Sequence, residues 1–206
     1  MAEAVETRVL WRGGADGNRL YLTFDDGPDP RWTPRVLDML AAHGVTATFF
    51  MVGRRAERHP DLVRRVVGAG HAIGSHTYRH TDLSAASPDD VRDELARAHE
   101  AIAQTAGRPP AMVRPPWGRI DPVGMLAAAR HAYPVVMWSA QITARHVDRD
   151  YRRTVAELRP GAIVLLHDGG PTPTGALMRA TGRLLDHAGA RYTLAPVTDL
   201  LAPARH

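Results

Sequence analysis

The sequence predicts an α/β fold built on a parallel sheet, in a single domain that spans residues 1–206. Short apolar runs alternate with amphipathic helical stretches along the chain, and this alternation is typical of parallel sheets covered by helices. The chain has 206 residues, 44% of them hydrophobic, which is enough to bury one core. The alternation fits an open sheet and a closed barrel equally, although a barrel of this length would be smaller than the usual ~250 residues.

The predicted strands are runs rich in aliphatic, β-branched or aromatic residues. They cover residues 19–24, 46–52, 71–74, 111–113, 134–138, 162–166 and 191–194. The predicted helices carry apolar side chains at helical spacing or begin at capping residues. They cover residues 34–43, 60–67, 88–102, 121–131, 151–158 and 174–187.

Local turn and cap chemistry determines several of these boundaries. Residues 15–18 have the composition of a turn, so residues 8–11 are the predicted hairpin partner of the first long strand. Thr33 is the predicted N-cap of the first helix, and Gly44 is placed to end it. Ser87 opens the clearest helix in a sequence that resembles a capping box.

Composition excludes several classes of protein. The chain has no cysteine, so disulfides and thiolate metal sites are excluded and any metal must bind His, Asp or Glu. The net charge is +4 and all 26 basic residues are arginines. These arginines are spread in separated pairs and no nucleic-acid motif accompanies them, so no nucleic-acid partner is predicted.

The chain contains no apolar run long enough to span a bilayer. Residues 1–8 carry acids and lack the apolar centre of a secretory signal. We therefore expect a cytoplasmic protein with no membrane span. The sequence does not specify an oligomeric state.

Ionisable side chains follow four of the predicted strands. Asp25 and Asp26 follow the first long strand, and His76 and His80 follow residues 71–74. At two later strand ends stand Arg114 and the pair His167-Asp168. Because α/β folds build their sites at the carboxyl ends of strands, these groups are expected to form one site.

Two histidines four residues apart and a carboxylate from another segment make a set of ligands for zinc or a similar divalent ion. His76, His80 and Asp26 are the candidates. In a turn both adjacent aspartates can approach one ion, so one can bind it while the other accepts a proton from water activated by that ion. Taken singly, each motif has an ordinary alternative. The two histidines could be a chance pair among 11 histidines, and the two aspartates could belong to a simple turn. Their placement at strand ends favours the metal site.

Hydrolysis of an amide also needs an acid that protonates the leaving nitrogen. His167 is suited to this role near neutral pH. Arg114 begins residues 114–118 (RPPWG), in which two prolines restrict the loop and Trp117 offers a flat face for a sugar. An ordinary loop with a core tryptophan is the alternative for this segment.

Together these motifs resemble the polysaccharide deacetylases, the nodulation-protein-B (NodB) homology group, also called carbohydrate esterase family 4. The motifs that carry the resemblance occur in family order, at residues 23–28 (TFDDGP), 73–80 (IGSHTYRH), 114–118 (RPPWG) and 165–168 (LLHD). The resemblance implies an irregular (β/α) barrel. It also implies a divalent metal cofactor, zinc first, with cobalt or nickel as alternatives.

The resemblance assigns a role to each matching residue. It implies that Asp25 is the general base, His167 the general acid and Arg114 the group that orients Asp25. The implied metal ligands are Asp26, His76 and His80. Leu165 is the implied contact for the acyl methyl group and Trp117 the implied contact for the substrate. A backbone N–H near Trp117 would stabilise the oxyanion.

One family motif departs from its usual form. Gln141 and Ala144 stand where acidic residues are expected, and Arg145 replaces a tryptophan. Loss of a carboxylate near His167 is expected to lower the pKa of that histidine. The nearby acids that could compensate are Asp148, Asp150 and Asp168.

The predicted function is removal of an N-acyl group, foremost acetyl, from an amino sugar or an amino-sugar-containing metabolite. The altered motif favours a small molecule or oligosaccharide over a wall polymer as substrate. Two alternatives remain open: an acetyl-ester hydrolase that uses the same site, and a non-catalytic relative that binds a metal or a sugar.

Overall fold

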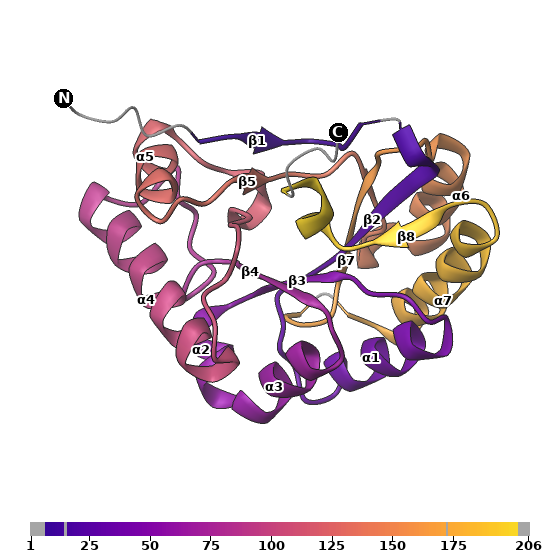
Figure 1. The fold of residues 1–206 in the computed structure, drawn as a ribbon, viewed down its shortest axis with the longest axis horizontal. Coiled ribbons are helices and arrows are strands. Elements are labelled where there is room, and N and C mark those ends of the chain that lie inside the picture. Colours follow the sequence, from indigo (N-terminus) through magenta and orange to yellow (C-terminus); the bar gives the residue numbers. More distant parts are fainter. Residues whose placement is uncertain (1–6, 15, 172, 202–206) are drawn as a thin grey trace.

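The protein is described by a computed structural model that covers residues 7–14, 16–171 and 173–201. Its helices lie around a central set of parallel strands (Figure 1). The strands are β1 (Val9–Leu10), β2 (Arg19–Asp25), β3 (Thr48–Met51), β4 (Ala72–Ser75), β5 (Val135–Val136), β6 (Ala140–Gln141), β7 (Ile163–His167) and β8 (Thr193–Ala195). The helices are α1 (Thr33–Ala42), α2 (Gly53–Arg58), α3 (Pro60–Gly68), α4 (Pro88–Ala106), α5 (Pro122–Arg130), α6 (Val147–Glu157) and α7 (Gly175–Gly189), with short 3-10 turns η1 (Asp16–Asn18), η2 (Pro116–Gly118), η3 (Ala144–His146) and η4 (Val197–Leu200).

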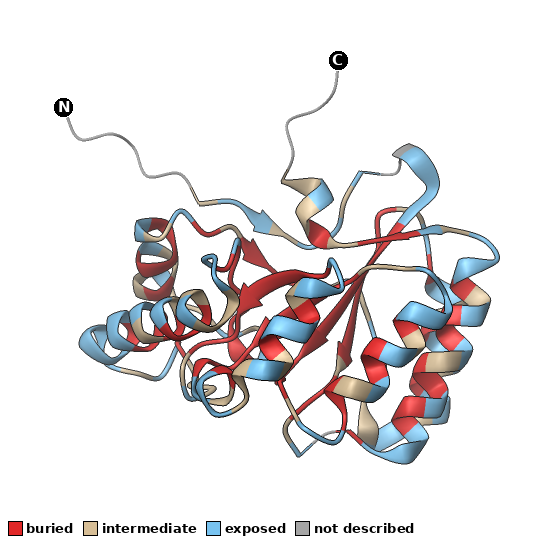
Figure 2. Cartoon of the chain, turned by 60° about the horizontal axis from the view of Figure 1, so that its bottom comes forward, coloured by how far each residue is buried: buried red, intermediate tan, exposed pale blue. Residues whose placement is uncertain are grey.

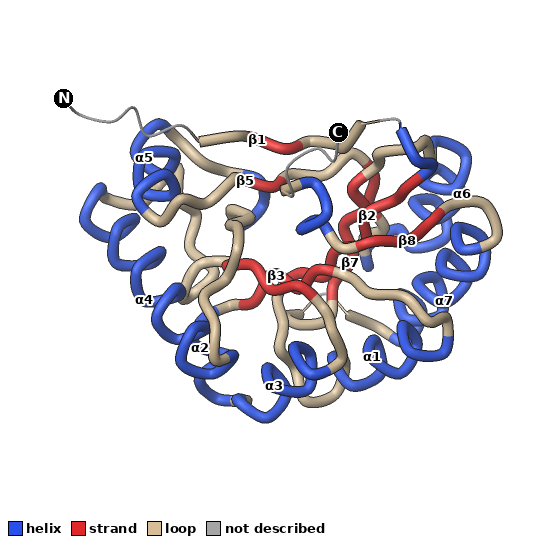
Figure 3. Tube along the Cα trace, in the orientation of Figure 1, coloured by secondary structure: helices blue, strands red, loops and turns tan. Residues whose placement is uncertain are grey.

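All pairs between these strands are parallel, as the strand–helix alternation predicts. The main path runs β4-β3-β2-β7-β6, with β8 on β2, while β1 pairs with β5. Val113 bridges β4 to β5, and an antiparallel bridge from Arg12 to Ala162 joins the segment after β1 to the start of β7. The strands therefore surround a common centre as an irregular barrel with helices outside (Figure 3).

The core lies on both sides of the central strands. Strands β3, β4 and β5 are buried at every position, and β2 is buried after its first residue. Strands covered on both faces need continuous apolar runs, which the sequence shows. The helices are buried along one side only (Figure 2); α4 places Val91, Leu95 and Ile102 in the core, on the predicted stripe.

Several predicted caps are confirmed. The hydroxyl of Ser87 accepts a hydrogen bond from the N–H of Asp90 at 3.2 Å and so begins α4. Gly44 follows α1 in the left-handed region, with φ 63°, where glycine is favoured. The predicted cap at Thr33 is wrong by one residue, because Trp32 holds the N-cap position. Thr33 Oγ1 instead accepts from the N–H of Asp29 and donates to the Asp168 carboxylate.

The predicted hairpin between residues 8–11 and β2 is also wrong. Val9 pairs in parallel with Val135 of β5. Both edges of β2 are already occupied. One edge pairs with β7, and the other pairs with β8 in its first half and with β3 in its second half, so no edge is free for β1. Ala15, part of the predicted turn, lies outside the described residues.

Two further differences concern short elements. Helix α2 was not expected, since six residues are too few to show helical periodicity. Residues 111–113, predicted as a strand, form only isolated bridges through Val113. In the part of the chain that the structure describes, no helix is both long and apolar enough to cross a membrane.

The cap of α4 generates a stability prediction. Ser87→Ala should lower the free energy of unfolding by about 1 kcal/mol, because the N–H of Asp90 loses its acceptor. Urea unfolding followed by circular dichroism measures the change. Ser87→Thr keeps the hydroxyl and should restore most of the lost stability; equal losses in both variants would show that the cap contributes nothing.

Candidate functional site

The site lies at the carboxyl ends of the parallel strands. Asp25 ends β2 and His167 ends β7, and the two are direct partners in the strand register. They open into a cleft of about 800 Å³. The residues that line the cleft are Asp25, Asp26, His76, His80, Trp117, Trp138, Gln141, Thr143, Ala144, Arg145, Leu165, His167 and Pro171.

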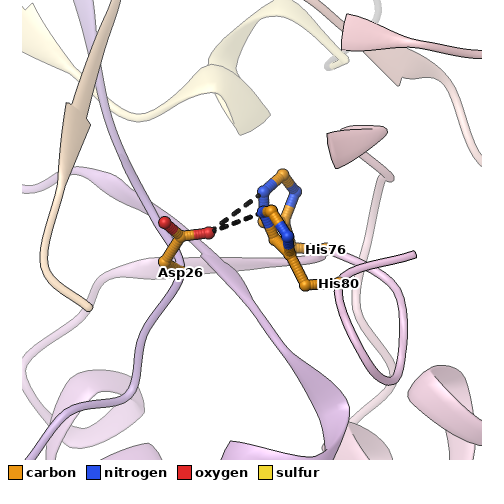
Figure 4. Close-up of side chains that lie close together, drawn as sticks. All are labelled: Asp26, His76 and His80. Carbon is orange, nitrogen blue, oxygen red and sulfur yellow. Dashed lines mark ion pairs between the residues drawn. The ribbon is translucent and has the colours of Figure 1, made fainter. Parts of the chain in front are cut away.

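Asp26, His76 and His80 point toward one another (Figure 4). Asp26 Oδ1 lies 3.0 Å from His80 Nε2 and 3.4 Å from His76 Nε2. One ligand atom from each residue lies within 4.8 Å of the other two. The structure thus brings together the three side chains that the sequence predicts as metal ligands.

The hydrogen bonds around these three residues fit a bound cation. His76 Nδ1 lies 2.7 Å from the carbonyl oxygen of Arg114; a carbonyl only accepts, so Nδ1 carries a proton and Nε2 is the nitrogen that faces Asp26. Asp26 Oδ1 is buried and has no hydrogen-bond partner among the described residues. Two imidazole nitrogens and a carboxylate oxygen that converge in this way match the donor set of a divalent metal ion.

Asp26 is also held as a carboxylate. Burial opposes its ionisation, but the contacts with His76 and His80 outweigh burial and hold the pKa of Asp26 well below its usual range. A charged carboxylate is the form that binds metal ions.

Left-handed backbone aims these side chains into the cleft. Asp26, His80 and Trp117 have φ of 73°, 68° and 55°, a region that residues other than glycine seldom adopt. In an extended strand, adjacent side chains point to opposite faces. The turn at Asp26 removes this constraint, so both adjacent aspartates line one cleft. Such outliers cluster at functional sites.

Arg114 holds Asp25 in place. Its Nη1 donates to Asp25 Oδ1 at 2.7 Å and to Thr23 Oγ1 at 2.7 Å. Its other donors reach the carbonyl oxygens of Val136 and Met137. Burial lowers the pKa of Arg114 and Asp25 opposes that change, but an arginine remains charged in proteins. One oxygen of Asp25 is therefore occupied by the guanidinium, and Oδ2 is left toward the cleft side, 3.8 Å from His76 Nε2.

The surroundings of His167 disfavour its charged form. Burial lowers its pKa, against the charges of Asp25 and Asp26, and its Nδ1 is buried without a hydrogen-bond partner among the described residues. The acids considered as compensators are engaged elsewhere. Asp150 accepts hydrogen bonds from Thr143, and the exposed Asp148 lies 4.0 Å from Arg183.

The predicted substrate contacts both line the cleft. Trp117 is 60% exposed, which excludes the alternative of a core tryptophan. Its ring stands edge-on to His80, with ring centroids 4.5 Å apart. Leu165 is nearly buried in β7 and reaches the cleft wall. The departing residues Gln141, Ala144 and Arg145 form part of the same wall.

Sequence reasoning missed Glu94. This carboxylate on α4 is 1% exposed and accepts hydrogen bonds from the N–H groups of Tyr78 and Arg79, at 3.0 and 2.8 Å. It thereby anchors the loop between the two ligand histidines. A glutamate on the apolar stripe of α4, next to Leu95, was the available signal, because buried charges are rare unless paired.

Asp168 was considered only as a neighbour of His167. It is fully buried beneath the turn that carries Asp26, accepts from Thr33 Oγ1 at 2.5 Å, and fills the space that a Cβ at Gly27 would need. Burial, reinforced by the charges of Asp26 and Asp25, raises the pKa of Asp168 to about 7.

The chain matches a family model and many known proteins. The model, described as polysaccharide deacetylase, matches residues 12–136. A chitooligosaccharide deacetylase of Bradyrhizobium sp. (strain ANU 289) is 43% identical over 164 residues, which cover 77% of this chain and 75% of the relative. A peptidoglycan-N-acetylglucosamine deacetylase of Bacillus cereus is 35% identical over 184 residues, which cover 85% of this chain and 66% of the relative.

Solved structures show the same fold. A peptidoglycan N-acetylglucosamine deacetylase in complex with 4-naphthalen-1-yl-N-oxidanyl-benzamide superposes with a TM-score of 0.87 at 28% identity, over 94% of this chain and 92% of that one. A carbohydrate esterase family 4 pseudoenzyme from Bacillus anthracis superposes with a TM-score of 0.85 at 25% identity, over 98% and 71%. The similarity confirms the predicted irregular barrel.

The anchor at Glu94 generates a prediction about metal binding. Glu94→Gln replaces one acceptor oxygen and removes the charge that holds the loop between His76 and His80, so zinc affinity should fall about 10- to 100-fold. Zinc titration against a competing chelator measures the change. Glu100→Gln, on the exposed side of the same helix, should leave the affinity unchanged. An unaltered zinc affinity in Glu94→Gln would show that Glu94 does not support the candidate metal site.

The buried Asp168 generates a prediction about pH. Its folded-state pKa of about 7 exceeds the unfolded value of ~3.9. The stability from its proton is therefore fully present below pH ~4 and is lost as pH rises through about 7. In EDTA, the free energy of unfolding should fall between pH 5 and 8.5 by about 2 kcal/mol more in the wild type than in Asp168→Asn.

Urea unfolding at the two pH values tests this dependence on pH. Asp61→Asn, at an exposed position of α3, is the matched control and should follow the wild type. If Asp168→Asn shows the same dependence as the wild type, Asp168 is ionised throughout.

Proposed function

Because the chain belongs to the polysaccharide deacetylase family, we propose that it removes an N-acetyl group from an amino sugar or an amino-sugar-containing molecule in a metal-dependent reaction. The family places the chain among hydrolases of carbon–nitrogen bonds other than peptide bonds. One observation carries the proposal: Asp26, His76 and His80 converge beside the Asp25–Arg114 pair and His167 in a single cleft. We also propose that the chain works as one catalytic domain.

Asp26, His76 and His80 would hold the metal. A divalent ion bound there supplies a Lewis acid for the acyl oxygen and lowers the pKa of water. We propose zinc as this ion, with cobalt or nickel as alternatives, because two imidazoles and one carboxylate suit these metals.

Asp25 is the proposed general base. Its Oδ1 is held by Arg114 at 2.7 Å, which leaves Oδ2 to accept a proton from the attacking water. The guanidinium keeps the carboxylate in one orientation. Arg114 therefore contributes by positioning Asp25, since it is fully buried and does not reach the substrate.

His167 is the proposed general acid. The departing nitrogen must gain a proton before it leaves as an amine. A histidine whose pKa is lowered, as burial does here, gives up its proton readily once it has received one. Its position opposite Asp25 in the strand register places base and acid at neighbouring strand ends.

The proposed substrate contacts are Trp117 and Leu165. The exposed indole of Trp117 offers a face for a sugar ring, and Leu165 offers an apolar surface for the acetyl methyl group. The relatives named above act on chitooligosaccharide or peptidoglycan. An oligosaccharide or a smaller molecule with an N-acetylated amino sugar is therefore the proposed substrate.

A non-catalytic role is the second candidate, because one structural relative is a pseudoenzyme. Every group that the proposed reaction uses is present in this chain, and all of their side chains except that of the buried Arg114 line one cleft, which favours turnover. An acetyl-ester hydrolase on the same site is the third candidate. Matched amide and ester substrates in one assay discriminate between the two hydrolases.

The role of Asp25 generates a prediction about activity. In zinc-loaded protein, Asp25→Asn should lower kcat for N-acetylglucosamine oligomers about 10²- to 10⁴-fold, because the base is lost. Acetate release measures kcat, and metal analysis should show that zinc remains bound. Asp61→Asn should retain full activity. Full activity of a zinc-loaded Asp25→Asn variant would rule out this mechanism.

A further inference from the structure

One wall of the cleft consists of the segment that departs from the family pattern. Gln141 ends β6 and is the register partner of Leu165, so it stands beside the surface proposed for the acyl methyl group. Arg145 lies in η3, four residues further along, and lines the same cleft. The side of the cleft that carries the acyl pocket therefore also carries Arg145.

This wall is held by contacts beneath it. Ile142 is fully buried and its N–H donates to the carbonyl oxygen of Leu165 at 3.3 Å. The hydroxyl of Thr154 on α6 donates to the carbonyl oxygen of Gln141 at 2.8 Å. The N–H of Thr143 donates to the Asp150 carboxylate at 3.2 Å. Sheet and helix contacts on both sides of η3 thus fix the backbone that carries Arg145.

The charges that line the cleft are compensated within the site, except one. Asp25 pairs with Arg114, and Asp26 contacts His76 and His80. Among the described residues, the exposed side chain of Arg145 makes no hydrogen bond and no ion pair.

Two of the three arginines on the following helix differ from Arg145 in this respect. Arg149 pairs with Asp150 at 3.2 Å, and Arg153 pairs with Glu157 at 3.2 Å. The third, Arg152, is exposed and makes no hydrogen bond or ion pair among the described residues, but it does not line the cleft. Among the described residues, Arg145 is the arginine that both lines the cleft and lacks a hydrogen-bond or ion-pair partner.

A guanidinium at this position offers a planar fork of donors that matches a carboxylate or a phosphate. A neutral sugar would not compensate that charge. We propose that Arg145 makes the cleft selective for N-acylated amino sugars that carry an anionic group, a carboxylate or a phosphate, near the acylated nitrogen. This inference rests on the proposed deacetylase function and specifies its substrate class.

Three substrates test the inference in the zinc-loaded protein. They are a neutral N-acetylglucosamine disaccharide, N-acetylmuramic acid with its carboxylate, and N-acetylglucosamine 1-phosphate. The wild type should show a higher kcat/KM for at least one anionic substrate than for the neutral one, and the two anionic arms distinguish carboxylate from phosphate. The preference should weaken with added salt, because exposed charges are screened.

Substitutions then locate the preference. Arg145→Ala should raise KM for the preferred anionic substrate about 5- to 20-fold, with kcat and the neutral substrate little changed. Arg145→Glu should raise that KM further, and Arg145→Lys should restore part of the loss because it keeps the charge without the fork. Arg153→Ala removes a compensated arginine and is the matched control.

The outcomes separate the inference from the proposed function. Equal kcat/KM values for neutral and anionic substrates, or an Arg145→Ala effect that is the same on both, would overturn the role of Arg145 while the deacetylase activity stands. If nothing is hydrolysed, calorimetric binding of the same three molecules decides. Anion-selective binding that needs Arg145 would support the selectivity and refute turnover, and equal binding would refute both.

Discussion

The guanidinium of Arg114 lies fully buried between β2 and the segment after β5, and much of the site geometry depends on its contacts. A buried cation is costly unless its donors are satisfied. Here they reach a carboxylate, a hydroxyl and two carbonyl oxygens. The backbone carbonyl of the same residue also orients the ring of His76. One residue thereby links the proposed base, one proposed metal ligand and three parts of the barrel.

The rest of the site depends on backbone that ordinary residues avoid. The left-handed turns at Asp26 and His80 each carry an unfavourable conformational energy. Contacts beneath them offset it: Asp168 fills the space under the Asp26 turn, and Glu94 binds the loop before His80. Neither of these two acids is among the residues that line the cleft. Buried contacts outside the cleft therefore hold the backbone that carries the candidate metal ligands.

The residues proposed to select the substrate lie in a different part of the cleft. The metal ligands, Asp25 and His167 come from β2, β7 and the loop after β4, whereas Gln141 and Arg145 come from β6 and η3. The residues of the proposed chemistry and those of the proposed selectivity thus sit on separate segments that meet across one cleft. The loss of acidic residues at Gln141 and Ala144 fits this division, since His167 keeps its position in the strand register.

The sequence by itself determined the strand–helix order, the caps at Ser87 and Gly44, and the residues of the candidate site. These are local properties, because periodicity, caps and turn chemistry each depend on a few adjacent residues. Only the tertiary structure decided that β1 pairs with β5, because edge availability on β2 depends on strands far along the chain. It also decided the contact of Thr33 with Asp168 and the contacts of Glu94 with Tyr78 and Arg79, which join residues 15 or more positions apart. Long-range contacts of this kind leave no periodic signal in the sequence. The loop that a buried acid supports is therefore decided only when the chain folds.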